Sequence, residues 1–225
     1  MAVIHGNAGE WARVKGTVFG LWPLFVSAFA LGFALAAWLF YSPVFGASLS
    51  FAALLSSVFA LQHGLSRVER YFKGARGEER VSWILRSLPD TYHVFNDFVA
   101  GRKHVDHVVV GPAGVFSVET KCWRGKVTLE EGHILLDGQL PDRAPLSQAL
   151  REASLVKGEL AKLGWSGTVT PVLTFASDTF EAKIAEAQGV VVLNSNHLKE
   201  SFSTGRVVMP PAELERLVRL MESKE

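Results

Sequence analysis

Two acidic residues and a lysine are spaced so that a β-hairpin would bring them together. Apolar, β-branched runs at His104–Val110 and Val115–Lys121 flank a Gly-Pro-Ala-Gly turn, and this pattern predicts two antiparallel strands. If the residues next to the turn pair with each other, Asp106 lies directly opposite Glu119. Opposed Cβ atoms in a sheet are roughly 5 Å apart, and like charges placed that way destabilise the pairing. The hairpin therefore predicts a compensating group between the two carboxylates.

A divalent cation held by oxygen ligands is the natural candidate for that group. Lys121 lies two residues beyond Glu119, so the strand period of two places both side chains on one face of the sheet. A metal-binding carboxylate pair beside an ammonium group is what hydrolysis of a phosphodiester bond requires. The competing interpretation is a solvated strand face, the usual origin of an isolated acid-x-Lys pattern. The opposed Asp106 favours the functional interpretation, and a third acidic element would strengthen it.

A third acidic element lies upstream, in a helix predicted over Gly77–Leu88 and ended by Pro89. Its apolar residues follow the i, i+3, i+4, i+7 spacing of one buried face: Val81, Ile84, Leu85 and Leu88. Glu78 precedes this stripe and projects near it, whereas Glu79 is about 100° further round and is expected to point towards solvent. A lone buried carboxylate is costly, so Glu78 needs a partner. The alternative is a glutamate that only favours the helix dipole, which does not explain the inward position.

Several further motifs follow one another along the chain. In order, they are Gly74-x-x-Gly77-Glu78, Asn96-Asp97, Val105–Gly111, Gly114–Phe116, Glu119–Lys121, Trp123-x-Gly125 and Pro145–Gln148. This succession resembles the nuclease-related (NERD) domain of the PD-(D/E)XK nuclease-like superfamily. The resemblance covers roughly Phe72–Leu163 and, more loosely, the remainder. One residue departs from the family pattern, because Cys122 stands where the family usually has an asparagine.

The resemblance implies a restriction-endonuclease-like fold, an α/β architecture with a mixed β-sheet flanked by helices. It also implies a Mg²⁺- or Mn²⁺-dependent endo- or exonuclease acting on nucleic acid, with DNA as the expected partner and no organic cofactor. The implied site consists of the metal ligands Asp106, Glu119 and the carbonyl of Thr120, the catalytic Lys121, the helix-borne acid Glu78 and the accessory Gln148. A fold does not by itself establish chemistry. A catalytically silent, membrane-tethered module for nucleic-acid binding or signalling is the alternative.

The front of the chain contains no Asp, Glu, Lys or Arg from Gly16 to Ser66. Tyr41-Ser42-Pro43 divides this run into apolar segments at about 18–40 and 44–62. At about 1.5 Å per residue, the first can cross the ~30 Å hydrocarbon layer of a bilayer and the second is just long enough. A signal peptide would have a shorter apolar core, and a core hairpin of a soluble protein would carry a polar face. We therefore predict a transmembrane helical hairpin in the lipid bilayer.

Flanking charges predict its orientation. Arg13 and Lys15 precede the hairpin, four cations follow it between Arg67 and Arg76, and the turn carries no charge. By the positive-inside rule both termini face the cytoplasm, and the single Cys122 agrees with a reducing compartment. We expect a multi-pass protein of the cell (inner) membrane. Its expected parts are a cytoplasmic tail at 1–16, the hairpin at 17–63 and a NERD-like domain at 64–225.

The remaining pattern predicts strands paired by hairpins and then alternating with helices, which is typical of a mixed sheet. The expected strands are Tyr92–Phe98, Lys126–Leu129, His133–Leu136, Val172–Phe175 and Val190–Leu193, and the expected helices are Pro145–Leu163, Asn196–Phe202 and Pro211–Glu222. Outside the tail the chain has equal numbers of basic and acidic residues, so nucleic-acid binding requires a local basic patch. The histidines lack a zinc-binding spacing. DNA versus RNA, the pathway and the oligomeric state stay open.

Overall fold

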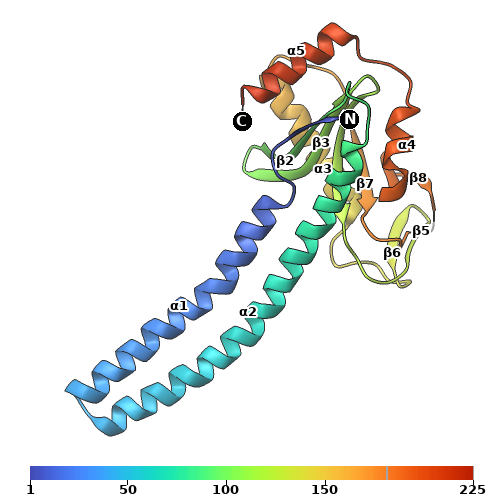
Figure 1. Ribbon diagram of the computed structural model, residues 1–225. Helices are drawn as coiled ribbons and strands as arrows, with labels where there is room; N and C mark the ends of the chain where they lie inside the picture. The colour runs from blue at the N-terminus through green and yellow to red at the C-terminus, as the bar shows by residue number, and fades with distance from the viewer. Residues whose placement is uncertain (181, 225) are drawn as a thin grey trace. The chain divides into compact units, whose positions relative to one another are not determined.

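The computed structural model describes residues 1–180 and 182–224, except for the side chains of residues 63, 66 and 67. The chain divides into two compact units, coloured by residue number in Figure 1. One unit consists of Met1–Glu10 and Arg76–Glu225, and the other of Trp11–Ala75. The first contains the sheets and the shorter helices, and the second is a hairpin of two long helices.

The helical hairpin is formed by most of α1 (Glu10–Phe40) and the first part of α2 (Pro43–Arg86). The two helices pack together far from their turn, where the rings of Phe19 and Tyr71 stack with centroids 5.9 Å apart. Each helix includes a stretch that is long and apolar enough to cross a membrane, and in α2 this stretch is Pro43–Gln62. The two predicted apolar helices are therefore confirmed.

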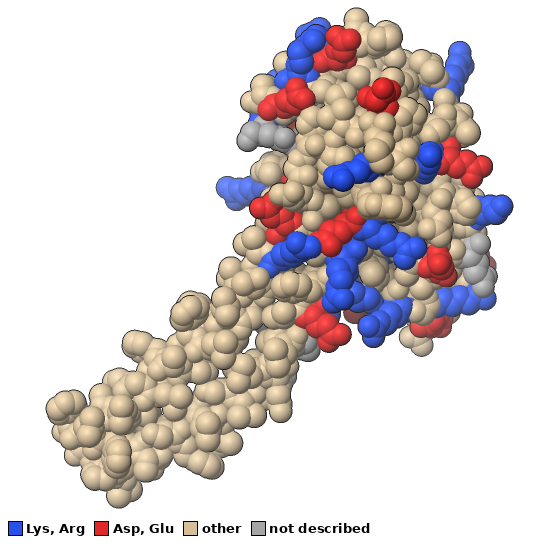
Figure 2. Space-filling model, viewed as in Figure 1, with Lys and Arg blue, Asp and Glu red and all other residues tan. Residues whose placement is uncertain are grey.

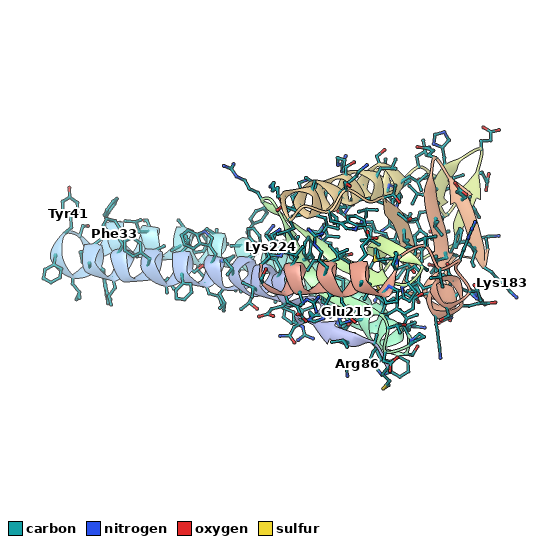
Figure 3. All side chains as sticks on the ribbon, turned by 90° about the horizontal axis from the view of Figure 1, so that it is seen from above. Phe33, Tyr41, Arg86, Lys183, Glu215 and Lys224 are labelled. Atoms are coloured by element: carbon teal, nitrogen blue, oxygen red, sulfur yellow. The ribbon has the colours of Figure 1, made fainter. Side chains whose placement is uncertain are left out.

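The surface of this hairpin is apolar. Only 6% of the apolar window in α1 and 17% of that in α2 is buried. Figure 2 shows the part of the hairpin near its turn free of acidic and basic side chains in this view, and in Figure 3 Phe33 and Tyr41 point away from the helices. Apolar surface of this extent is unfavourable in water. The exposure separates these helices from the core helices of soluble proteins, which are mostly buried.

The helix predicted over Gly77–Leu88 is not a separate element. It forms the last part of α2, which runs without a break from Pro43 to Arg86. The sequence between the apolar segment and Gly77 contains no proline, and a glycine inside a helix costs only about 1 kcal/mol relative to alanine. Nothing in this segment therefore ends the helix, which stops at Arg86, two residues before the predicted end at Leu88.

The main sheet has seven strands in the order β1-β2-β3-β4-β7-β9-β8. Its strands are β1 (Val3–His5), β2 (His93–Ala100), β3 (Lys103–Gly111), β4 (Gly114–Lys121), β7 (Val169–Phe175), β8 (Ile184–Ala187) and β9 (Val190–Asn194). Strand β3 is antiparallel to both β2 and β4, whereas β1 is parallel to β2 and the strands β4, β7 and β9 are parallel to one another. A separate hairpin pairs β5 (Val127–Glu130) with β6 (His133–Leu136). The predicted mixed sheet is confirmed.

Helices cover both faces of the sheet. Val110 of β3 packs in one core cluster with Val156 of α3 (Pro145–Lys162) and Leu217 of α5 (Pro211–Glu222). On the other face, Val109 packs with Leu85 of α2, and the same cluster includes residues of α4 (Leu198–Ser203), which follows a 3₁₀ turn at Ser195–His197. Neighbouring strand residues thus enter opposite cores, as the period of two requires. This sandwich holds β3 and β4 rigidly from both sides.

Two strands were not predicted, and both are short edge elements. β1 has three residues and lies parallel to β2, with the Val3 N–H donating to the Tyr92 carbonyl at 2.9 Å. β8 has four residues and lies antiparallel to β9. Runs this short have too few residues to show an alternating pattern. The first ten residues consequently belong to the same compact unit as the sheet.

Candidate active site

The β3–β4 hairpin has the register that the turn predicts. Val110 pairs with Val115, and the pairing continues to His107 and Val118. The next two residues in this register are Asp106 and Glu119, and here the ladder ends. The Asp106 Oδ2 atom instead accepts a hydrogen bond of 2.8 Å from the Thr120 N–H. A side chain of β3 thus replaces a backbone contact to β4, and it fixes the Asp106 carboxylate at the end of the hairpin.

The β2–β3 pairing is also interrupted at Asp106. Asn96 pairs with His107 and Phe98 with Val105, whereas the intervening Asp97 and Asp106 do not form a pair in the ladder. Asp97 has a left-handed φ of 50°. Phe95 and Phe98, which are three residues apart, enter the same core cluster, so the alternation shifts by one residue in each strand. Such irregularities change the direction of side chains next to functional sites. The side chains of β3 therefore do not alternate strictly between the two faces across Asp106, as a regular strand would require.

Lys121, Glu119 and Gln148 are in direct contact. The Lys121 Nζ atom donates to Glu119 Oε1 and to Gln148 Oε1 at 2.9 Å. The Gln148 amide donates in turn to Glu119 Oε1 at 2.8 Å and to Glu152 Oε1 at 2.9 Å. Gln148 lies in the first turn of α3, which begins with Pro145. One amide therefore connects the lysine with two carboxylates.

Glu152 is a site residue that the sequence reasoning missed. Burial, followed by a side-chain hydrogen bond and charge repulsion from Glu119, raises the pKa of Glu152 to about 9. The Oε2 atom of Glu152 is buried and has no hydrogen-bond partner in the described part of the chain. Glu152 is one helical turn after Gln148, among the buried residues of α3. Glu152 lies on a buried helix face, as Glu78 does, and the cost of burying a lone carboxylate was the signal that could have found it.

Glu78 belongs to the same group of charges. Burial, and then repulsion from Asp97 and Glu119, raises the pKa of Glu78 to about 7, while Lys121 and the Gly9 N–H act in the opposite direction. Gly77 permits this position, because a Cβ atom there would lie 2.8 Å from the Cβ of Cys122, directly after β4. The missing side chain of Gly77 lets α2 approach the strand that carries Glu119 and Lys121.

The expectation that Glu79 points towards solvent is wrong. Glu79 is only partly exposed and its Oε1 atom is buried. Ala75, one turn earlier on the same face of α2, is 1% exposed. The helix is therefore covered on more than the one apolar stripe that the sequence shows.

Glu78, Asp106, Glu119 and Glu152, together with Lys121 and Gln148, are called the carboxylate cluster below. Burial, and then repulsion from Glu119, Glu78 and Glu152, raises the pKa of Asp106 above its usual range, although the Thr120 N–H opposes this. Four acids thus share one lysine. Crowding of this kind forces some carboxyls to stay neutral unless another positive charge is present.

The cluster fits a hard divalent cation. All its donors to a metal are oxygen atoms, and Mg²⁺ is typically bound through one or two carboxylates and several waters. Asp106 and Glu119 supply two carboxylates at the end of one hairpin. Glu152 Oε2 adds a buried oxygen that has no partner among the described residues. A cation would neutralise the repulsion that raises the pKa of Asp106.

A second group of possible ligands lies elsewhere. Among the described residues, His5, His93 and Glu222 place three ligand atoms within 4.8 Å of one another. The ring nitrogens of His5 and His93 are 3.2 Å apart, the ring centroids are 5.5 Å apart and the rings are nearly parallel. A separation of this size suits a shared proton in a hydrogen bond, and two ligands of one tetrahedral ion have a similar spacing.

Comparison with protein families gives one match. Residues 73–176 match the family model described as nuclease-related domain. The matched segment contains every residue of the carboxylate cluster. Comparisons with curated proteins and with solved structures gave no match.

Proposed function

We propose, from the premise that this chain carries a nuclease-related (NERD) domain, that it is a membrane-anchored, metal-dependent nuclease. The observation that carries the proposal is the carboxylate cluster, in which four buried or half-buried acids surround Lys121. The cluster lies at the end of a rigid hairpin between two cores, and such rigidity suits a catalytic site.

Each residue of the cluster has a proposed role. Asp106, Glu119 and the carbonyl of Thr120 hold one Mg²⁺ or Mn²⁺ ion. When bound, such an ion polarises a phosphate and lowers the pKa of a coordinated water. Lys121 touches the attacking water or a phosphate oxygen and offsets the negative charge that develops there. Glu78 orients a water from the opposite side.

Gln148 and Glu152 are positioning residues in this proposal. The Gln148 carbonyl holds the Lys121 ammonium group at 2.9 Å, and its amide holds Glu119. Burial and Glu119 raise the pKa of Glu152 to about 9, so Glu152 is mostly protonated near neutral pH as long as no cation is bound. It can therefore anchor Gln148 without adding another negative charge.

Mg²⁺ binding is expected to weaken at least about tenfold when the pH falls from 8 to 6, because a proton competes with the cation for the cluster. Glu78, with its raised pKa of about 7, is mostly ionised at pH 8 and mostly protonated at pH 6. Calorimetric titrations in buffers of different ionisation enthalpy measure both the affinity and the proton release. Glu78→Gln should flatten the dependence and exposed Glu186→Gln should preserve it. An affinity that stays constant over this pH range in the unaltered chain would contradict the proposal.

The helical hairpin is proposed to anchor the domain in the membrane. Its apolar stretches are long enough to span a bilayer and are largely unburied. Phe29 and Phe40, for example, are 80% and 88% exposed. The basic residues that flank both outer ends of the hairpin favour the cytoplasmic side for both termini. The nuclease domain would then act at the inner face of the cell membrane.

A reporter fused after Glu225 is expected to be active only when the reporter functions in the cytoplasm. The same result is expected for a reporter placed before Met1, because both ends of the hairpin share one side. A reporter inserted in the turn at Ser42 serves as the control and should be active only outside. Activity of the fusion after Glu225 on the outer side would refute this topology.

A further inference from the structure

A basic cavity lies beside the carboxylate cluster. It has a volume of about 380 Å³, and its lining includes Lys103, Arg143 and Arg151 together with Ser147, Gln148 and Glu152. Lys103 is the first residue of β3, and the others belong to α3 or directly precede it. Gln148 and Glu152 are shared with the cluster, so a single layer of side chains separates the cavity from Glu119 and Lys121.

The three cations of this cavity are unpaired. In the part of the chain that the structure describes, Lys103, Arg143 and Arg151 form no salt bridge or side-chain hydrogen bond, and all three are exposed. By contrast, Lys162 and Lys224 both pair with Glu159. Unpaired charges of one sign around a hollow focus the electrostatic potential and concentrate counter-ions there.

The start of α3 adds a favourable field. Ala144 provides no side-chain cap, and the first residue of the helix is Pro145. The first backbone hydrogen bond at the start of α3 is donated by the Gln148 N–H to the Ala144 carbonyl oxygen, with the nitrogen and oxygen 3.2 Å apart. The Ser147 N–H precedes that bond, at the cavity wall. The uncompensated N–H groups of a helix start favour an anion.

We propose that this cavity binds one backbone phosphate of a nucleic-acid strand, next to the phosphate whose bond the cluster cleaves. Arg143 and Arg151 contact the phosphate oxygens, and Lys103 neutralises the strand from the β3 side. The cavity thereby sets the register of the strand relative to Asp106 and Glu119. It also supplies the local basic patch that the balanced charge of the chain lacks overall. This inference rests on the proposed nuclease function, because the phosphate bound in the cavity is defined by its position next to the phosphate that is cleaved.

Binding can be measured without cleavage. The full chain in detergent micelles is titrated against a fluorescent single-stranded DNA oligonucleotide in EDTA, and anisotropy gives the affinity at several salt concentrations. The double variant Arg143→Gln/Arg151→Gln is expected to bind at least about tenfold more weakly. Its slope of log K against log salt should be smaller by about 0.7 for each lost phosphate contact. Lys157→Gln, which removes an exposed cation of α3 outside the cavity, should change neither quantity.

The outcomes separate this inference from the nuclease function. With Mg²⁺ present, the double variant should raise KM and leave both kcat and Mg²⁺ affinity unchanged. DNA binding that depends on Arg143 and Arg151, in a chain that never cleaves, would support the cavity and contradict the nuclease. Cleavage with an unchanged KM and salt slope in the double variant would overturn the cavity and leave the nuclease standing. A chain that binds no oligonucleotide, or variants that weaken only the binding of anionic lipid vesicles, would also overturn it.

Discussion

Lys121→Met is expected to reduce metal-dependent cleavage by at least about a hundredfold while Mg²⁺ binds as tightly as before or more tightly. Loss of one group that stabilises transition-state charge typically costs about a hundred- to a thousandfold in rate. Lys121 is the single basic side chain bonded to Glu119 and Gln148 among the described residues. Removal of the Lys121 positive charge makes the cluster more negative and so more attractive to Mg²⁺. The substitution must therefore lower the cleavage rate and not the affinity for Mg²⁺.

Single-turnover rates and calorimetric Mg²⁺ titrations test this split. Lys199→Met is the matched control, because Lys199 is an exposed lysine of α4 outside the cluster. A Lys121→Met protein that cleaves at the unaltered rate would remove Lys121 from the mechanism. A variant that loses both cleavage and Mg²⁺ binding would show that Lys121 organises the metal ligands instead.

Asp106→Asn is expected to abolish cleavage and, in the absence of metal, to stabilise the domain. Asparagine keeps an oxygen acceptor for the Thr120 N–H but removes one of four crowded charges. Relief of repulsion that shifts a pKa by one unit corresponds to about 1.4 kcal/mol, so a gain of about 1 kcal/mol in unfolding free energy is expected. The raised pKa of Asp106 fixes the sign, because the native carboxyl loses its proton less readily than the unfolded one. The gain therefore grows as the pH rises above about 4.

Denaturant unfolding in EDTA at pH 5 and pH 8 measures this gain, with exposed Glu186→Gln as the control. A substitution that lowers activity and raises stability is typical of a site in which like charges repel one another until a ligand binds. Destabilisation of the Asp106→Asn variant at pH 8 would show that the carboxylate is a structural anchor of the hairpin and not a ligand of the cation. In that case Mg²⁺ should not stabilise the unaltered chain against unfolding.

The hairpin shows which parts of the fold the sequence can predict. The Gly-Pro-Ala-Gly turn and the valine-rich runs on either side fix the register, and the pairing of Val110 with Val115 is confirmed. The interruption at Asp97 and Asp106 could not be predicted. A left-handed φ at Asp97 depends on how three neighbouring strands meet, and a local pattern contains no information on that meeting.

The helix-borne acids show the same limit in the site. The phase of one apolar stripe was enough to place Glu78 among the charges of Asp97, Glu119 and Lys121. The same stripe gave no sign that the adjacent face of α2, with Ala75 and Glu79, is also covered, so Glu79 was placed wrongly. Glu152 escaped notice because acids on a long helix usually face solvent. Its position between Ala149 and Val156, on the face of α3 that packs over β4 and β7, was the signal that could have revealed its burial.

A cleavage assay with the purified full chain in detergent micelles tests the proposed nuclease activity directly. Labelled DNA and RNA are incubated with the unaltered chain and with Asp106→Asn, in Mg²⁺ or Mn²⁺ and in EDTA. Products are expected only from the unaltered chain and only with a divalent cation. Equal cleavage by Asp106→Asn, or no cleavage of either nucleic acid by the folded, metal-bound chain, would contradict this expectation, and the domain would then be a tethered binding module without turnover.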